Sequence, residues 1–246
     1  MHELISAGHV VALTGAGISA ESGIPTFRGE GSDPRRGNPA VSASIANFRR
    51  DPAAYWAVSR ERGRTALQAK PNAAHVALAE LERAGLVDAV ITQNTDRLHL
   101  DAGSRRLIEL HGNGRQVECL DCGARESRAD VQARLETEMP PRCRMCGGAY
   151  LKPTVVLFGE PLPADALRGA VALAQACRTM LVVGSSLVVQ PAAQLPLIAH
   201  DHGADVVIVN REPTPLDRIA TSVIRRRAAE FLPDLVHLAG ASRRPR

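Results

Sequence analysis

This chain of 246 residues has few aromatic side chains and almost no lysine. Aromatic residues make up 3% of the sequence, and its only lysines are Lys70 and Lys152, so the net charge of +4 comes from arginine. No aromatic residues are interleaved with the basic ones, so base stacking has no support and we expect no specific nucleic-acid partner. The arginines therefore indicate a solvated basic surface, with weak attraction to acidic partners as the alternative.

Targeting and membrane-spanning segments are lacking as well. The N-terminus has none of the three regions of a secretory signal, and no apolar run approaches the roughly 18 residues that cross a bilayer. We therefore expect a cytoplasmic protein that contacts no membrane. With 45% hydrophobic residues, the chain is long enough for one large α/β domain and a small module.

Four of the five cysteines form two C-x-x-C pairs, Cys119 with Cys122 and Cys143 with Cys146. Glycine follows each pair, in CLDCG and CRMCGG, and such turns allow both sulfurs to point at one centre. Four thiolates complete a tetrahedral shell without an open position, so we expect one structural Zn²⁺. The alternative is a redox or disulfide pair, which is disfavoured in a chain without an export signal.

A glycine turn follows the first apolar run of the chain, HVVALT at residues 9–14. Gly15, Gly17 and Ala20 have the G-x-G-x-x-[GA] spacing of dinucleotide sites. In that pattern Gly15 permits a tight turn, Gly17 lets the backbone approach a pyrophosphate, and Ala20 lets the next helix pack on the strand. Glycine turns are equally common as plain packing devices, so the spacing alone leaves both interpretations open. An irregular stretch at residues 28–39 is expected to be a loop that closes over a ligand.

Strand-like and helical patterns alternate along the chain. The strands are predicted at residues 9–14, 89–92, 107–110, 155–158, 179–184, 205–210 and 222–225, and the main helices at 72–84, 164–177 and 192–202. Such alternation predicts a doubly wound, mostly parallel Rossmann-like sheet with helices on both faces. Polar segments follow most of these strands, so they should meet in one crevice at the carboxyl edge of the sheet.

Two segments interrupt the alternating pattern and suggest how the chain is divided. We predict a Rossmann-like dinucleotide-binding domain made of residues 1–27, 71–115 and 151–240. Residues 28–70 form a helical and loop insertion, with short helices at 42–50 and 53–67. Residues 116–150 form the zinc-binding lobe, and residues 241–246 form a basic tail.

Eight segments in a fixed order resemble one family, the sirtuins, which are NAD-dependent protein deacylases. The resemblance extends from about residue 10 to residue 233. Its segments are GAGIS at 15–19, GIPTFRG at 23–29, TQNTDRLH at 92–99, HGN at 111–113, the two C-x-x-C pairs, KPTVVLFGE at 152–160, GSSLVVQPAA at 184–193 and NREPTPLD at 210–217.

The resemblance implies that NAD is a co-substrate and that His111 is a general base, which deprotonates a ribose hydroxyl after nicotinamide leaves. It implies that Asn94 orients the ribose and a water, that Asp96 accepts a hydrogen bond from the nicotinamide carboxamide, and that Phe27 shields the reactive face from water. The other residues implied to bind NAD are Gly15, Ala16, Gly17, Ser19, Ala20, Thr26, Arg28, Gln93, Gly184, Ser185, Ser186, Asn210, Glu212 and Ala228.

The same resemblance places an extended acyl-lysine peptide between residues 156–159 and 186–189, paired through main-chain hydrogen bonds. Val156, Phe158, Gly159 and Val188 would line the path of the lysine. The PTFRG segment is similar to a branch that removes acidic acyl groups, whose carboxylate is bound by a tyrosine and an arginine three residues apart. Here Arg62 matches that arginine, but Ser59 occupies the tyrosine position, which argues against specialised removal of succinyl groups.

The function predicted from these segments is NAD-dependent removal of acyl groups from lysine, with nicotinamide and 2′-O-acyl-ADP-ribose as products, by a monomer acting on acyl-lysine proteins or peptides. Mono-ADP-ribosyl transfer is the second enzymatic alternative. A non-catalytic NAD-sensing protein is a third, which the presence of both His111 and Asn94 disfavours. A hydride-transferring dehydrogenase would need an acidic residue closing a second Rossmann strand and no zinc ribbon, and neither holds.

Overall fold

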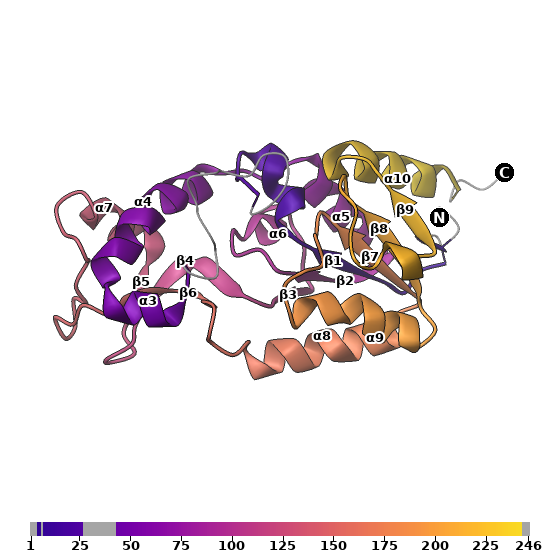
Figure 1. The fold of residues 1–246 in the computed structure, drawn as a ribbon. Coiled ribbons are helices and arrows are strands. Elements are labelled where there is room, and N and C mark those ends of the chain that lie inside the picture. Colours follow the sequence, from indigo (N-terminus) through magenta and orange to yellow (C-terminus); the bar gives the residue numbers. More distant parts are fainter. Residues whose placement is uncertain (1–3, 6, 27–42, 243–246) are drawn as a thin grey trace.

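The computed structural model describes residues 4–5, 7–26 and 43–242, with side chains to residue 238. The larger of its two sheets has six strands. Figure 1 shows this sheet flanked by helices and, beside it, a smaller group of strands and helices. Phe27, Arg28 and the predicted loop at 28–39 lie outside the described residues. Within the described ranges, no helix has both the length and the apolar character that crossing a membrane requires.

The large sheet is parallel throughout and has the strand order β3-β2-β1-β7-β8-β9. Its strands are β1 (Val10–Thr14), β2 (Val87–Thr92), β3 (Leu107–Glu109), β7 (Thr179–Val183), β8 (Asp205–Val209) and β9 (Ser222–Ile224). The chain runs outward in opposite directions from the β1/β7 pair. Ligand sites of doubly wound sheets lie beyond the carboxyl ends of the strands at such a reversal.

Two apolar cores cover the two faces of this sheet, as the alternating pattern predicts. Val10 and Ala12 of β1 share one core with α5 (Ala73–Arg83) and α10 (Ala228–Ser242), whereas Val11 and Leu13 share the other with α8 (Ala164–Ala176) and α9 (Leu195–Asp201). Successive strand residues point to opposite faces, so a strand with both faces covered is apolar at every position. The VVALT sequence of β1 is fully buried for this reason.

The smaller sheet has the order β5-β4-β6 and is antiparallel. It consists of β4 (Gly112–Cys119), β5 (Arg125–Ser127) and β6 (Leu151–Val155), and it packs with α3 (Ile45–Arg50), α4 (Pro52–Gln68) and α7 (Arg128–Arg134) around a third core. The helical insertion and the cysteine segment, which are separated in sequence by the β2–β3 region, therefore share one core that includes Trp56, Val117 and Leu151.

Two expectations about local structure are wrong. The strand predicted at 155–158 is β6, which ends at Val155 and belongs to the small sheet. Beyond it, the Leu157 amide donates to the Glu160 carboxylate and the Phe158 amide donates to the Ala43 carbonyl, so the chain leaves the β4 ladder. The turn after β1 opens a 3₁₀ helix, η1 (Ala16–Ser22), and Ala20 on it is exposed and does not pack on the strand.

The remaining helices are short or lie near the edges of the sheets. They are α6 (Leu98–Asp101), η3 (Ala192–Gln194) and η4 (Asp217–Ile219). The helix predicted at 192–202 is thus η3 followed by α9. The insertion helices predicted at 42–50 and 53–67 are α3 and α4, which begin at the side-chain caps of Ser44 and Asp51.

Candidate functional site

A cavity of about 1040 Å³ lies at the carboxyl edge of the large sheet and extends to the small one. It is at the upper end of the roughly 300–1,000 Å³ usual for ligand pockets, so it can hold a dinucleotide together with part of a second ligand. The residues predicted for ligand binding that line it are Gly15, Ala16, Gly17, Ser19, Ala20, Thr26, Arg62, Gln93, Asn94, Asp96, His111, Val156, Phe158, Gly159, Gly184, Ser185, Ser186, Asn210, Glu212 and Ala228. Val188 is 50% exposed and does not line the cavity, whereas its neighbour Val189 does.

The glycine turn packs tightly against the loop that follows β7. The amides of Gly15 and Gly17 donate to the carbonyls of Val183 and Gly184, at 3.1 and 2.8 Å. A Cβ on Gly17 would lie 2.8 Å from Gly184 Cα, so only glycine allows this approach. The sequence assigned Gly17 to contact with a pyrophosphate, but its amide is already used within the protein.

The amide orientation of Asn94 is determined by hydrogen bonds on its nitrogen. Nδ2 donates to the Gly15 carbonyl and to Ser19 Oγ, both at 3.1 Å. The Asn94 backbone amide donates to Thr92 Oγ1 at 3.1 Å. Both hydrogens of the side-chain amide are therefore engaged, which leaves its oxygen as the acceptor available to a ligand in the cavity.

The carboxylate of Asp96 is likewise oriented by hydrogen bonds on both of its oxygens. One carboxylate oxygen accepts the Ser19 hydroxyl at 2.7 Å and the other accepts the Leu98 amide at 2.9 Å. The side chain is 8% exposed and faces the cavity. A carboxylate oxygen can accept more than one hydrogen bond, so Asp96 can still accept one from a ligand amide.

Two buried histidines, His75 and His99, form hydrogen bonds with hydroxyl groups next to this part of the site. Ser19 Oγ donates to Asp96, so it accepts from His75 Nε2 at 3.4 Å. His75 Nδ1 in turn accepts the Asn72 amide. Similarly, Thr14 Oγ1 donates to Thr92 and accepts from His99 Nε2 at 2.9 Å.

Both histidines are neutral. Burial lowers the pKa of His75 to about 4, against a smaller opposite effect of Asp96, and burial with the nearby His75 lowers the pKa of His99 to about 3. Their rings are 4.9 Å apart. Within the described part of the chain His99 Nδ1 has no hydrogen-bond partner, which agrees with an unprotonated nitrogen.

His111 follows β3 and presents one nitrogen to the cavity. Its Nδ1 donates to the Gln93 carbonyl at 2.9 Å, so Nε2 carries the free lone pair. Desolvation lowers the pKa of His111, and the bond to Gln93 opposes this shift. Gly112 next to it has φ +68°, and a Cβ there would lie 2.0 Å from the Thr154 carbonyl oxygen, so the turn that positions the ring requires glycine.

The remaining polar residues connect the strand ends. Gln93 Nε2 donates to Ser185 Oγ at 2.9 Å and thereby links the loops after β2 and β7 across β1. After β8, Asn210 Nδ2 donates to the Glu212 carbonyl, and Arg225 donates to the carbonyls of both residues. This loop is therefore shaped by its own hydrogen bonds before any ligand binds.

The segment predicted to pair with a peptide is already partly paired. The Val156 amide donates to the His111 carbonyl at 2.9 Å, and the amides of Leu157 and Phe158 donate to Glu160 and Ala43. These three amides are therefore engaged within the protein, and the pairing of a peptide with residues 156–159 stays a prediction that depends on the other main-chain groups of this segment. The Phe158 side chain is 40% exposed beside the cavity.

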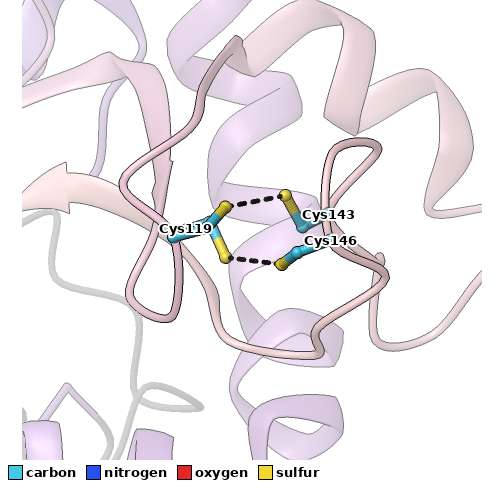
Figure 2. A group of neighbouring side chains, drawn as sticks. Cys119, Cys143 and Cys146 are labelled. Carbon is cyan, nitrogen blue, oxygen red and sulfur yellow. Dashed lines mark hydrogen bonds between the residues drawn. The ribbon is translucent and has the colours of Figure 1, made fainter.

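Four sulfur atoms come together in the small lobe, the segment of residues 116–150 that was predicted to bind zinc. The Sγ atoms of Cys119, Cys122, Cys143 and Cys146 lie within 4.8 Å of one another. The sulfurs of Cys119 and Cys146, and those of Cys122 and Cys143, are each 3.7 Å apart. Figure 2 labels three of these side chains, Cys119, Cys143 and Cys146, and marks the contacts with dashed lines. Tetrahedral Zn–S bonds of about 2.3 Å place sulfurs about 3.8 Å apart, close to the 3.7 Å of the two facing pairs, so the four cysteines fit a structural Zn²⁺.

Comparison with known proteins identifies the family. A model of the Sir2 family matches residues 15–191. The chain belongs to the Sir2 family. It is 52% identical over 233 residues to a protein of Archaeoglobus fulgidus named NAD-dependent protein deacylase 2, with 95% of this chain and 92% of that protein covered. A Caldivirga maquilingensis protein named NAD-dependent protein deacetylase is 48% identical, with 95% and 89% covered.

Solved structures of Sir2 proteins match over nearly the whole chain. One described as "Structural Basis for the Mechanism and Regulation of Sir2 Enzymes" has a TM-score of 0.91 at 49% identity and covers 98% of this chain and 97% of its own. Another, described as "Sir2-p53 peptide-NAD+", has a TM-score of 0.90 at 44% identity and covers 97% of both chains.

Sequence reasoning missed several residues of this Sir2 site. Thr14, His75 and Thr92 hydrogen-bond predicted NAD-binding residues, and His99 hydrogen-bonds Thr14, but the sequence analysis gave none of the four a role of its own. One local signal did exist. Asn72 and His75 have the spacing of a capping box, which they form at the start of α5.

Proposed function

We propose that this protein is an NAD-dependent protein deacylase, which removes the acyl group from a modified lysine and releases nicotinamide and 2′-O-acyl-ADP-ribose. The observation that carries the proposal is the orientation of His111. Its Nδ1–H is held by the Gln93 carbonyl, and its unprotonated Nε2 shares the cavity with Asn94 and Asp96. Relatives that are about half identical over nearly the full chain bear the names of such enzymes.

NAD, when bound, supplies a ribose carbon that accepts the acyl oxygen once nicotinamide leaves. The residues of the chain bind and orient the nucleotide and accept a proton from it. Asn94 Oδ1 accepts a ribose hydroxyl, because both N–H groups of its amide are held by Gly15 and Ser19. Asp96 accepts from the carboxamide of nicotinamide. His111 Nε2 takes the proton of a ribose hydroxyl, for which a neutral imidazole of lowered pKa is suited near pH 7.

Other parts of the chain hold the two substrates. The loops after β1, β7 and β8 surround the space for the diphosphate and adenosine, and Gln93 ties two of them together. Val156 and Phe158 border the path of the acyl-lysine. Structures of Sir2 proteins are described as bound to acetylated and propionylated peptides, which supports acyl-lysine peptides as substrates. That the protein acts as a monomer and in the cytoplasm stays a prediction.

The test is incubation with NAD and peptides that carry acetyl-, butyryl-, succinyl- or lipoyl-lysine, followed by mass spectrometry. At least one peptide should lose its acyl group in a 1:1 ratio with the nicotinamide released, and His111→Ala should be nearly inert. Activity without NAD contradicts the proposal. Label from adenylate-labelled NAD that stays on the peptide would favour ADP-ribosyl transfer instead.

A further inference from the structure

A buried ion pair connects the two ends of the loop at residues 156–160, which borders the predicted path of the lysine. Lys152, the second residue of β6, is 7% exposed, and its Nζ donates to the Glu160 carboxylate at 2.9 Å. The same nitrogen donates to the Val155 carbonyl at 2.7 Å. Val155 is the last residue of β6, and Glu160 belongs to the cavity wall. One ammonium group therefore links the end of the strand to the far end of the loop.

Glu160 shapes the loop from its other end. Its carboxylate accepts the Leu157 amide at 2.8 Å, and its own amide donates to the Leu157 carbonyl at 3.0 Å. The oxygen that accepts from Leu157, Oε2, is also the one that accepts from Lys152. Loss of the ammonium would therefore disturb a turn whose shape depends on this carboxylate.

The hydrogen bonds of the loop determine which of its main-chain groups a peptide can use. The amide of Val156 and both backbone groups of Leu157 and Phe158 are bonded within the protein. Among the described residues, the Val156 carbonyl and the amide and carbonyl of Gly159 have no hydrogen-bond partner. These groups are the ones left to pair with an extended peptide, and they lie between the two groups that Lys152 bonds.

The geometry at this position favours lysine over arginine. Lys152 is one of only two lysines in a chain whose other basic residues are arginine. Both of its acceptors, the Val155 carbonyl and the Glu160 carboxylate, converge on the single Nζ atom. An ammonium is compact and donates three hydrogens from one atom, whereas a guanidinium is a wide planar fork. Lysine therefore fits a buried position that has two converging acceptors.

A stabilising effect alone does not account for the pair. The side chains of Lys152 and Glu160 are 9% and 23% exposed, so both charges lose most of their hydration. That cost offsets much of the attraction, and apolar side chains of similar volume are often as stabilising as a buried ion pair. Apolar side chains cannot, however, supply the donor for the Val155 carbonyl and the acceptor for the Leu157 amide.

We propose that Lys152 is a positioning residue for the acyl-lysine peptide, because it fixes the loop whose free main-chain groups pair with that peptide. This inference rests on the proposed deacylase function and extends it. Lys152 does not line the cavity, so it acts through Val155 and Glu160. The space for the diphosphate and adenosine is surrounded by the loops after β1, β7 and β8, so the effect of Lys152 should be confined to the peptide.

The experiment compares the binding of the two substrates to Lys152→Met, which retains a long side chain without its donors. Dissociation constants are measured by fluorescence anisotropy for a dye-labelled acetyl-lysine peptide, and by calorimetry for NAD without peptide. The peptide should bind about tenfold more weakly or worse, as expected for loss of a charged hydrogen bond, and NAD should bind as it does to the wild type. Lys70→Met is the matched control, because Lys70 is exposed after the end of α4, and it should change neither value.

A double variant separates positioning from stability. Lys152→Met leaves Glu160 as an unpaired, mostly buried carboxylate, which by itself is destabilising. Lys152→Met combined with Glu160→Gln removes that charge and keeps an acceptor for the Leu157 amide. Its thermal stability should return toward the wild-type value. Its affinity for the peptide should stay about tenfold low, because the Val155 carbonyl still lacks its donor.

Folding of each variant is checked through Trp56. Its Nε1 donates at 2.9 Å to the carbonyl of Leu151, the residue before Lys152, and it is the only tryptophan of the chain. Its emission therefore shows whether the third core is intact beside the substituted position. A double variant that does not fold, or that regains peptide affinity together with stability, shows that the pair is structural only and overturns the inference.

The other outcomes separate this inference from the proposed function. If the wild type removes acyl groups but Lys152→Met binds the peptide as tightly, or loses affinity for NAD to the same extent, the inference is wrong and the deacylase function is intact. If the affinities change as expected but no acyl group is removed in the presence of NAD, Lys152 positions a bound peptide and the deacylase function fails. A wild-type protein that does not bind the peptide contradicts the inference.

Discussion

Ser19 donates its hydroxyl hydrogen to Asp96 across 2.7 Å and joins the turn after β1 to the loop after β2. The same oxygen accepts from Asn94 Nδ2 and His75 Nε2. The Ser19 hydroxyl, which lies on the 3₁₀ helix η1, therefore sets the orientation of both Asn94 and Asp96 in the loop after β2. Ser19 is only 1% exposed. Its role is therefore to position Asn94 and Asp96 through hydrogen bonds.

Ser19→Ala should lower kcat/KM for NAD by about 100-fold, because Asn94 and Asp96 lose a shared partner and small displacements of positioning groups have effects of this size. Initial rates of nicotinamide release measure it. Ser22→Ala is the matched control on the same 3₁₀ helix, where the hydroxyl accepts from Asn72 Nδ2. An active Ser19→Ala protein would show that the hydroxyl does not organise the site.

The pH dependence of the reaction should follow His111. The lone pair of Nε2 is needed, and burial lowers the pKa of this histidine below its usual 6.5. Protonation therefore removes activity only as the pH falls through that lowered value, so the acid limb of the profile should be centred below pH 6.5 and the rate should be level above pH 7. A profile of kcat/KM against pH tests this, and an acid limb centred above 6.5 would contradict a buried neutral base.

The large sheet and the zinc ligands could be predicted from the sequence because their signals are local. VVALT is apolar at every position, and each C-x-x-C pair lies in one turn. The supports of the site could not be predicted in this way. Thr14, His75 and His99 meet because β1, α5 and α6 pack together, and Arg128 meets Trp56 across 72 residues of sequence. Such contacts depend on tertiary packing, which no spacing along the chain encodes.

Chelation of zinc should unfold the small lobe and stop the reaction. Cys119 and Cys143 belong to the same core as Trp56 and Leu157, so loss of the metal loosens the wall of the cavity. Zinc release, followed with a chromogenic chelator, should parallel the loss of deacylation and of near-ultraviolet circular dichroism. Cys177→Ser, remote from the four ligands, should retain zinc. Full activity in metal-free protein would disprove a structural role.

The two buried histidines should make the fold sensitive to acid. Their pKa values are about 4 and about 3 in the folded protein and near 6.5 when unfolded, so the unfolded chain gains protons first as the pH falls. Stability is complete above pH 6.5 and declines below it, by about 4 kcal/mol for the pair at pH 5. Urea unfolding at pH 7 and pH 5 measures this. His99→Gln should be less stable at pH 7 but should lose only about half as much between the two values.

Gly63→Ala tests whether α4 is shaped around Arg128. Alanine would favour the helix by about 1 kcal/mol, but its Cβ would lie 2.0 Å from Arg128 Nη2, between the guanidinium and Gln132. Because the guanidinium is held by Ser59 and stacks on Trp56, it cannot move without losing these contacts, and a net destabilisation of about 1–3 kcal/mol is expected. Gly169→Ala in α8 is the matched control, since its Cβ would meet only the flexible end of Ile108 at 3.2 Å, and it should be neutral or stabilising. If thermal unfolding shows Gly63→Ala to be as stable as Gly169→Ala, the guanidinium is free to move and Gly63 is not there to accommodate it.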